Sequence, residues 1–326
     1  MNLMMAAGDA KSAVTNLLVA KKLPHLHAEY VADTLVQTSL DGIDTHGLRL
    51  LATYIRELDG GRSNVRPSFR FRGSLRAVTV LDADSALGVV AGNVAMRRAV
   101  KLASRYGIGA VGVANSNHFG AAGHYAKIAA ARDQIGLAFS NSDSLVRPQD
   151  GTEAINGTNP IAMAAPSADG RDFVLDMATS ETAFSKLLST GVSLSSVVPL
   201  APLGGFKGQG LGTMVQILCA VLSEMPFDCE LSHLYDPPFD IPRKISHFFL
   251  SIDLKGFGQP MEIKARIARL LQKFRSSTPA KVDPVRVPGD VERLAREERL
   301  RDGIPVAADV YDLLKPYSEA RHALAI

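Results

Sequence analysis

Residues 107–120 carry the sequence GIGAVGVANSNHFG, in which an apolar run passes directly into a polar turn. The run 108–114 is apolar throughout and has the length of a strand that is buried on both faces. The polar residues 115–120 follow, and apolar residues with helical spacing cover 121–131. The stretch therefore predicts a buried strand that ends in a turn and opens a helix. Main-chain N–H groups point outward at such a junction, so binding groups collect there.

The flanking segments alternate in the same way. Residues 77–82 are rich in β-formers, 89–105 have helical spacing, and 135–140 again suit a strand. This order of strands and helices predicts an α/β fold with a sheet that is at least partly parallel. Farther along, we expect strands at 161–165, 172–177 and 247–253, and helices from 211 and over 261–274.

Both ends of the chain are expected to be helical. Apolar stripes predict helices at 13–20, 24–37 and 46–58, the last ending at Gly60-Gly61, a pair suited to a C-cap. Two charged helices are expected in the tail from 291. We therefore expect a helical N-terminal domain at 1–64, joined by C-terminal helices at 283–326, and an α/β core at 65–282.

Composition limits the class of function. The 326 residues have a net charge of +3 and no Trp, which disfavours a basic stripe or a stacking platform for nucleic acid. No run reaches the ~18 apolar residues of a membrane span, and no secretory signal is evident. Cys219 and Cys229 form no Cys-x-x-Cys pair, which favours a reducing compartment. We expect a cytoplasmic protein without a nucleic-acid or membrane partner.

The glycines of the opening stretch match the pattern G-x-G-x-x-G at Gly107, Gly109 and Gly112. In a dinucleotide-binding βαβ unit these glycines follow the strand, so that the pyrophosphate meets free N–H groups of a helix. Here they lie before and inside the strand, and Lys127 stands near the position where an acidic residue would hold the ribose. We interpret Gly107 as a helix cap and the others as small strand residues, which excludes a Rossmann fold.

Two segments carry histidines suited to proton transfer. His46 lies in Asp-Thr-His-Gly, residues 44–47, and Arg49 follows it. A histidine titrates near neutrality and can give a proton to a developing alkoxide, while an arginine fork can hold a carboxylate. Taken alone, this segment is better explained by a helix N-cap at Thr45 with a surface His and Arg. His118 lies in the polar turn 115–120, for which simple capping by Asn117 or Ser116 is the alternative.

Three further segments offer binding groups. Thr158, Asn159 and Pro160 form a small polar turn, and Asp176 ends an apolar strand, where it could orient a histidine or cap a helix. Lys207 lies in the Gly-rich segment 204–210, where glycines let the backbone approach a ligand and lysine supplies charge for phosphate. A surface loop is the alternative there.

The order of these segments along the chain resembles the second type of malate/L-lactate dehydrogenase. That family includes ureidoglycolate dehydrogenase, 2,3-diketogulonate reductase, sulfolactate dehydrogenase and Δ1-piperideine-2-carboxylate reductase. The resemblance covers most of the chain and rests on residues 45–47, 115–120, 157–160, 176–180, 204–210, 247–249 and 287–290.

The resemblance implies a non-Rossmann α/β fold with a mixed sheet, a homodimer, and NAD or NADP as cofactor. It implies that the core 65–282 binds the cofactor and forms the dimer. His46 is expected to be the proton donor in reduction, with His118, Asp176 and Arg49 as further catalytic residues. The expected cofactor-binding residues are Thr158, Asn159, Pro160, Asp176, Met177, Ala178, Thr179, Ser180, Phe206, Lys207, Gly289 and Asp290.

The expected reaction moves a hydride between the nicotinamide and a small 2-oxo or 2-hydroxy acid. A cyclic-imine reductase of the Δ1-piperideine-2-carboxylate type is an alternative. A non-catalytic family member is another, because the segment between Lys186 and Gly204 is shorter than in typical members. Arg49 also departs from the family pattern, in which the arginine stands four residues after the histidine, where this chain has Leu50. A metal enzyme has little support, because His118 and His124 are wrongly spaced for one helix face.

Overall fold

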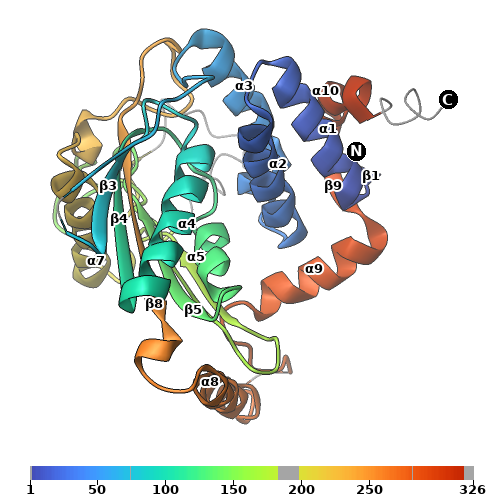
Figure 1. Ribbon diagram of the computed structural model, residues 1–326, viewed down its shortest axis with the longest axis vertical. Coiled ribbons are helices and arrows are strands. Elements are labelled where there is room, and N and C mark those ends of the chain that lie inside the picture. Colours follow the sequence, from blue (N-terminus) through green and yellow to red (C-terminus); the bar gives the residue numbers. More distant parts are fainter. Residues whose placement is uncertain (1, 74, 183–197, 281, 319–326) are drawn as a thin grey trace.

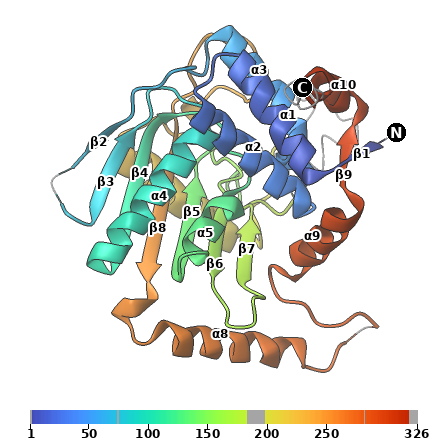
Figure 2. The ribbon, with the colours of Figure 1, turned by 45° about the vertical axis from the view of Figure 1, so that its right-hand side comes forward.

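The apolar run forms β4 (Ile108–Ser116), an inner strand of a seven-stranded sheet (Figure 1). The computed structural model describes residues 2–73, 75–182, 198–280 and 282–318. Figure 2 shows the strands of this sheet in the order β2 (Arg70–Arg72), β3 (Val78–Asp82), β4, β8 (Ile245–Asp253), β5 (Gln134–Ser140), β6 (Ile161–Ala165) and β7 (Phe173–Met177).

The sheet is mixed, as predicted. β3 and β4 are parallel, whereas β8 lies between β4 and β5 and runs antiparallel to both. β4 and β5 therefore point the same way without being neighbours. The remaining pairs, β2–β3, β5–β6 and β6–β7, are antiparallel.

Helices cover both faces of the sheet. α4 (Gly88–Tyr106) and α5 (Ala122–Ala130) pack on one face through alanines and small apolar residues. On the other face, α7 (Phe206–Gln216) and the turn Ile217–Val221 pack against β5 and β8. Successive residues of β5 serve the two cores, since Ala138 faces α5 while Phe139 faces α7.

Close packing explains the misleading glycine pattern. Gly107 caps α4 with φ +85°, a left-handed conformation that favours glycine. A Cβ on Gly109 would stand 2.2 Å from the Ala99 carbonyl oxygen, so only glycine lets β4 approach α4 this closely. The glycines serve helix and strand packing, which confirms that this segment is not a dinucleotide fingerprint.

The two ends of the chain form a helical layer beside the sheet. α1 (Ala7–Ala20), α2 (His25–Leu40) and α3 (Leu51–Gly60) share a core with α10 (Ala308–Ser318), and β1 (Asn2–Met5) pairs antiparallel with β9 (Ile304–Ala307). α8 (Pro260–Arg275) and α9 (Asp290–Asp302) lead from the sheet back to this layer (Figure 1). The division into domains at 64/65 and 282/283 stays a prediction.

Three helix starts differ from expectation, and α1 begins at Ala7 rather than at 13. The helix predicted from His46 begins at Leu51, after two short turns at Asp44–His46 and Leu48–Leu50. Gly47 breaks the helix because its backbone is extended and packs against Ser39, where a Cβ would stand 2.1 Å from Oγ. The third of these helices, α7, begins at Phe206 and not at 211, so it absorbs part of the glycine-rich segment.

Candidate functional site

A cavity of about 350 Å³ opens where the turns before α3, the ends of β4 and β5, and the loop 232–243 meet. A volume of this size suits a small ligand. Its lining includes both predicted histidines, His46 and His118. The other polar lining residues are Thr45, Ser140, Asn141, Ser142, Asp143, Thr158, Asp176, His233, Tyr235, Arg243 and Glu292.

The two histidines form a pair in this cavity. Their rings stack with 6.0 Å between centroids and 27° between planes. His46 Nδ1 is hydrogen bonded to the Thr45 hydroxyl at 3.0 Å, and His118 Nδ1 to the Tyr54 hydroxyl at 3.1 Å. Because both Nδ1 atoms are engaged, both Nε2 atoms remain for a ligand or for proton transfer.

Burial keeps both imidazoles neutral at pH 7. It lowers the pKa of His46, and it lowers the pKa of His118 well below the ordinary value. The positive charge of Arg243 lowers the pKa of His118 further, and a proton on His46 would act in the same direction. A neutral imidazole can accept the proton of a substrate hydroxyl, so the pair is suited to general acid–base chemistry.

Asp176 stands at the end of β7, on the far side of the cavity from the loop 232–243. Its Oδ2 accepts a hydrogen bond from the Gly123 N–H at 2.7 Å, which ties β7 to the start of α5. The side chain is exposed to both cavities, and desolvation by the protein around it raises its pKa to about 6. A Cβ on Gly123 would stand 2.9 Å from Oδ2, so glycine makes room for the carboxylate.

Arg243 is the one arginine or lysine among the described residues of this lining. Its Nε donates to the Ser232 carbonyl oxygen at 2.9 Å, and its Nη2 is paired with Asp143. The other carboxylate oxygen of Asp143 is 3.3 Å from His233 Nε2. In the part of the chain that the structure describes, Arg243 Nη1 has no hydrogen-bond partner, which leaves it for an anionic ligand.

A second cavity of about 560 Å³ adjoins the first, and the two share Ile43, Ala121, Asp176 and Glu292. It lies between α2, α5, α9 and residues 170–174, and its described lining holds six arginines and lysines and six carboxylates. Among the described residues, Arg97 and Arg132 of this lining form no ion pair. The others are paired, for example Lys127 and Arg296 with Asp41. Together the two adjoining cavities form one candidate site.

Most predicted site residues border this space. His46, His118, Thr158, Pro160, Asp176, Met177 and Ala178 line the first cavity, and Gly289 and Asp290 line the second. Asp290 is held by Arg275 at 2.8 Å, and Gly289 has φ +100° at the start of α9. The structure thus brings together segments separated by more than two hundred positions.

Three predicted residues stand behind the lining and support it. Asn159 is fully buried, and its Nδ2 donates to Asp228 Oδ2 at 2.7 Å and to the Gly212 carbonyl oxygen at 3.1 Å. The buried Thr179 donates to the Thr158 carbonyl oxygen at 3.1 Å, and Ser180 is buried next to it. These contacts fix the turn that presents Thr158.

Three others lie elsewhere. Arg49 is exposed and borders a separate cavity of about 140 Å³ beside β9, because in the turn Leu48–Leu50 it is Leu50 that faces the histidines. Phe206 and Lys207 are exposed in the first turn of α7 and line neither of the two large cavities. Lys186 and most of the short segment before Gly204 lie outside the described residues.

Sequence patterns did not reveal Tyr54, Asp143, His233 or Arg243. Tyr54 follows His46 at the spacing of two helical turns, and this spacing is the one local feature of the sequence that could have pointed to it. Arg243 and His233 come from a loop without regular structure that only the fold brings to the histidines. Among the described residues, no group of three His, Cys, Asp or Glu side chains could hold a metal ion. No helix among them is long and apolar enough to cross a membrane.

Comparison with known proteins gives the family. The family model for malate/L-lactate dehydrogenase matches residues 5–193 and 190–315, and the two matches meet inside the segment expected to be short. The malate dehydrogenase of Pyrococcus abyssi is 34% identical over 93% of this chain and 91% of its own length. The NAD(+) ureidoglycolate dehydrogenase of Escherichia coli K12 is 29% identical, over 92% of each chain.

The fold agrees with this relationship. The structure of malate dehydrogenase from Pyrococcus horikoshii OT3 matches with a TM-score of 0.90 and 32% identity over 98% of this chain and 95% of that one. The similarity therefore spans the histidine pair, both cavities and the helical layer together. This chain belongs to the malate/L-lactate dehydrogenase family.

Proposed function

We propose that the protein is an NAD(P)-dependent oxidoreductase that interconverts a small 2-oxo acid and its 2-hydroxy acid. One observation carries the proposal: the neutral pair His46 and His118 lines a small cavity, which adjoins a larger one that offers two arginines without an ion-pair partner among the described residues. A substrate in the first and a dinucleotide in the second would meet beside these imidazoles. Relatives named as NAD(+)-dependent and NADP(+)-dependent dehydrogenases support the choice of cofactor.

The donor set of the larger cavity fits a nicotinamide dinucleotide. Arg97 and Arg132 are unpaired cations suited to a diphosphate. The carboxylates of Glu292 and Asp176 at the junction are suited to hydroxyl donors of a ribose. When bound, the cofactor supplies the hydride chemistry, and the protein supplies position and electrostatics.

His46 is the proton-transfer residue of this proposal. In oxidation the neutral imidazole accepts the proton of the substrate hydroxyl, and in reduction the protonated form returns it to the oxygen. Thr45 fixes the ring through Nδ1 and leaves Nε2 toward the cavity. His118, held by Tyr54, packs against His46. Burial lowers the pKa of His46 and so favours the neutral form that accepts the proton.

Arg243 takes the role of carboxylate anchor that the sequence suggested for Arg49. Its free Nη1 borders the same cavity as both imidazoles, and its Nη2 is already fixed by Asp143. A carboxylate bound at Nη1 would place the adjacent C2 of the substrate near His46. Holding the reacting atoms in this way accounts for a large part of catalysis in such reactions.

An absorbance assay tests the proposal. Purified protein is mixed with NADH or NADPH and with pyruvate, oxaloacetate, sulfopyruvate, 2,3-diketogulonate or Δ1-piperideine-2-carboxylate. Loss of reduced cofactor with an oxo acid is expected, turnover of the cyclic imine alone would move the substrate to C=N compounds, and turnover of none refutes the proposal. Replacing His46 with Ala should lower kcat by about 10²- to 10⁴-fold, the usual contribution of a general acid.

We also propose that the protein is a cytoplasmic homodimer that joins through the outer face of α7 and the turn after it. Met214, Ile217 and Val221 follow helical spacing there and are 38%, 50% and 49% exposed. An exposed apolar stripe of this kind is typical of an interface. Light scattering should give the mass of two chains, and Ile217→Lys should give one; a monomeric wild-type protein would contradict the dimer.

A further inference from the structure

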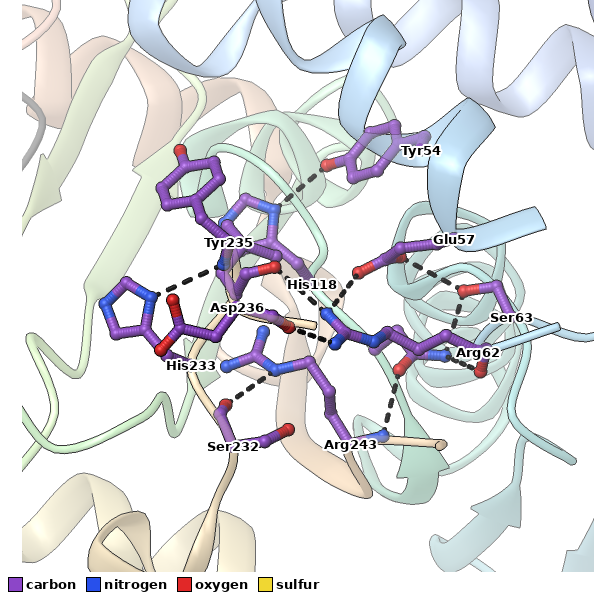
Figure 3. A network of polar contacts seen from close by, with 12 residues as sticks. Tyr54, Glu57, Arg62, Ser63, His118, Ser232, His233, Tyr235, Asp236 and Arg243 are labelled. Atoms are coloured by element: carbon purple, nitrogen blue, oxygen red, sulfur yellow. Dashed lines mark hydrogen bonds and ion pairs between the residues drawn. The ribbon is translucent and has the colours of Figure 1, made fainter. Parts of the chain in front are cut away.

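Arg62 is the largest fully buried side chain among the described residues, with 1% exposure. It follows α3 and Gly61 and points into the protein. Nη1 donates to the Leu234 carbonyl oxygen at 3.0 Å, and Nη2 donates to the carbonyl oxygens of Asp236 and Pro238 at 2.6 and 2.7 Å. Figure 3 shows this guanidinium beside the loop that carries Tyr235 and Asp236. One side chain thus holds alternate carbonyls of a single loop.

The loop has no regular secondary structure of its own. Residues 232–243 contain no helix or strand, so no ladder of main-chain hydrogen bonds fixes their course. The Arg62 N–H donates to the Phe239 carbonyl oxygen at 2.8 Å, and the Arg62 guanidinium lies 4.4 Å from the Phe239 ring centroid. Main chain and side chain of Arg62 therefore contact the carbonyl oxygens of four loop residues, Leu234, Asp236, Pro238 and Phe239.

This loop brings functional groups to the first cavity. His233, Leu234, Tyr235 and Arg243 all line it. The fully buried Asn117 links Arg62 to Arg243. Its Nδ2 donates to the Arg62 carbonyl oxygen at 3.3 Å, and its Oδ1 accepts from the Arg243 N–H at 3.3 Å. Asn117 directly precedes His118. The position of Arg243 relative to the histidines thus depends on Arg62 through a short chain of buried contacts.

A buried cation is costly unless it is paired and hydrogen bonded. The oppositely charged partner of Arg62 is Glu57, but Glu57 Oε1 is 3.9 Å from Arg62 Nη1, beyond hydrogen-bond distance. Glu57 Oε2 accepts instead from the Ser63 hydroxyl at 3.1 Å. The direct hydrogen bonds of the guanidinium all go to the loop, and this indicates that the loop is what the cation is placed to hold.

We propose that Arg62 is a positioning residue for substrate binding, which fixes the loop 232–243 so that Arg243, His233 and Tyr235 stand correctly against the histidine pair. The proposal rests on the proposed function of that pocket. Lysine cannot replace the arginine, because its single nitrogen lacks the planar fork that reaches separate carbonyls. The cofactor cavity is lined by other segments, so its affinity should not depend on Arg62.

The test compares Arg62→Lys with wild type in three measurements. Hydrogen exchange of the amides in 232–243 should accelerate while exchange in β4 and β8 stays the same. KM for the oxo acid should rise about 10- to 100-fold, the scale of an ångström-level misplacement, with kcat within about threefold. The Kd for NADH or NADPH from nicotinamide fluorescence should stay within twofold. Unchanged loop exchange or an unchanged KM would overturn the proposal.

Two further variants separate positioning from folding. Arg56→Lys is the matched control, because exposed Arg56 also lies near the Phe239 ring, at 5.7 Å, but donates to no carbonyl of the loop; it should behave as wild type. The double variant Glu57→Gln with Arg62→Met removes both buried charges and should fold, yet retain the high KM and fast loop exchange. A wild-type KM in that variant would show that Arg62 only neutralises Glu57, and would also overturn the proposal.

The proposed function can fail separately. If wild-type protein neither turns over any oxo acid nor binds oxalate, an unreactive analogue, the function of the pocket is refuted and Arg62 has no substrate site to position. If wild type is active and Arg62→Lys matches it, only the role of Arg62 is refuted.

Discussion

Tyr54→Phe tests the architecture of the histidine pair with the removal of one oxygen atom. Tyr54 is fully buried on α3, and its hydroxyl is 3.1 Å from His118 Nδ1. Burial also raises the pKa of Tyr54 well above its ordinary value, so the phenol keeps its proton at any working pH. Phenylalanine fits the same space, so the substitution removes a hydrogen bond and leaves the packing intact.

The size of the effect follows from that geometry. A net hydrogen bond contributes about 0.5–1.5 kcal/mol, and a partner left unsatisfied costs about 1–3 kcal/mol. His118 borders the cavity, where water can replace the hydroxyl, so we expect a loss of about 1 kcal/mol and a fall in melting temperature of about 2 °C. If the ring loses its orientation at a similar cost, kcat falls about 5- to 10-fold, since 1.4 kcal/mol corresponds to tenfold.

Steady-state kinetics and thermal unfolding measure the two quantities on the same samples. Tyr125→Phe is the stability control, because Tyr125 is also fully buried and its hydroxyl donates to the Phe119 carbonyl oxygen. An unchanged kcat in Tyr54→Phe would show that Tyr54 does not orient His118. A loss beyond about 10³-fold would exceed an orienting effect and assign Tyr54 a direct part in the chemistry. Either result refutes the arrangement as described.

Three further outcomes are expected. Gly109→Ala should destabilise the protein by about 1–3 kcal/mol or more, because its Cβ would meet the Ala99 carbonyl oxygen. Gly107→Ala has open space around it and should cost only the strain of the left-handed backbone, about 1 kcal/mol. Equal urea midpoints for the two variants would contradict the packing argument. Arg243→Lys should raise KM for the acid with little change in the cofactor Kd, and a cofactor effect alone would place Arg243 elsewhere in the mechanism. Stability should fall between pH 7 and pH 5. The folded state binds fewer protons than the unfolded state at five histidines whose pKa is lowered by burial, His27, His46, His118, His124 and His247. The carboxyls with raised pKa, Asp176 at about 6, Asp228 at about 7 and Glu57, act with the opposite sign but are fewer. A rise in the urea midpoint over that range would contradict the assignment for the histidines.

Local patterns predicted many elements of the sheet. The apolar run at 108–114 and the alternation around it correctly gave β3, α4, β4, α5 and β5 and a sheet that is partly parallel, and the structure places the parallel pair at β3 and β4. The insertion of β8 between β4 and β5 was beyond such patterns, because it depends on pairing across more than a hundred residues. Local spacing contains no information about that choice of neighbour.

The residues of the candidate site could also be predicted only in part. His46 and His118 border one cavity, as the family resemblance implied. The position of Arg49 depended on whether the helix began at His46, and the break at Gly47 turned Leu50 toward the cavity instead. Arg243 and Arg62 could not be found from sequence, because a loop of irregular backbone has no period to follow and a lone buried arginine resembles an exposed one.

The central claim is that hydride passes between a nicotinamide and C2 of an acid in the cavity beside His46. Wild-type protein is incubated with reduced cofactor that carries deuterium at the transferring C4 position, together with the oxo acid that the absorbance assay selects, and the product is examined by mass spectrometry. The account predicts a 2-hydroxy acid that is heavier by one deuterium, bound to C2, and no such product from His46→Ala over the same time. A product formed without deuterium at C2, or no product from any oxo acid, would contradict it.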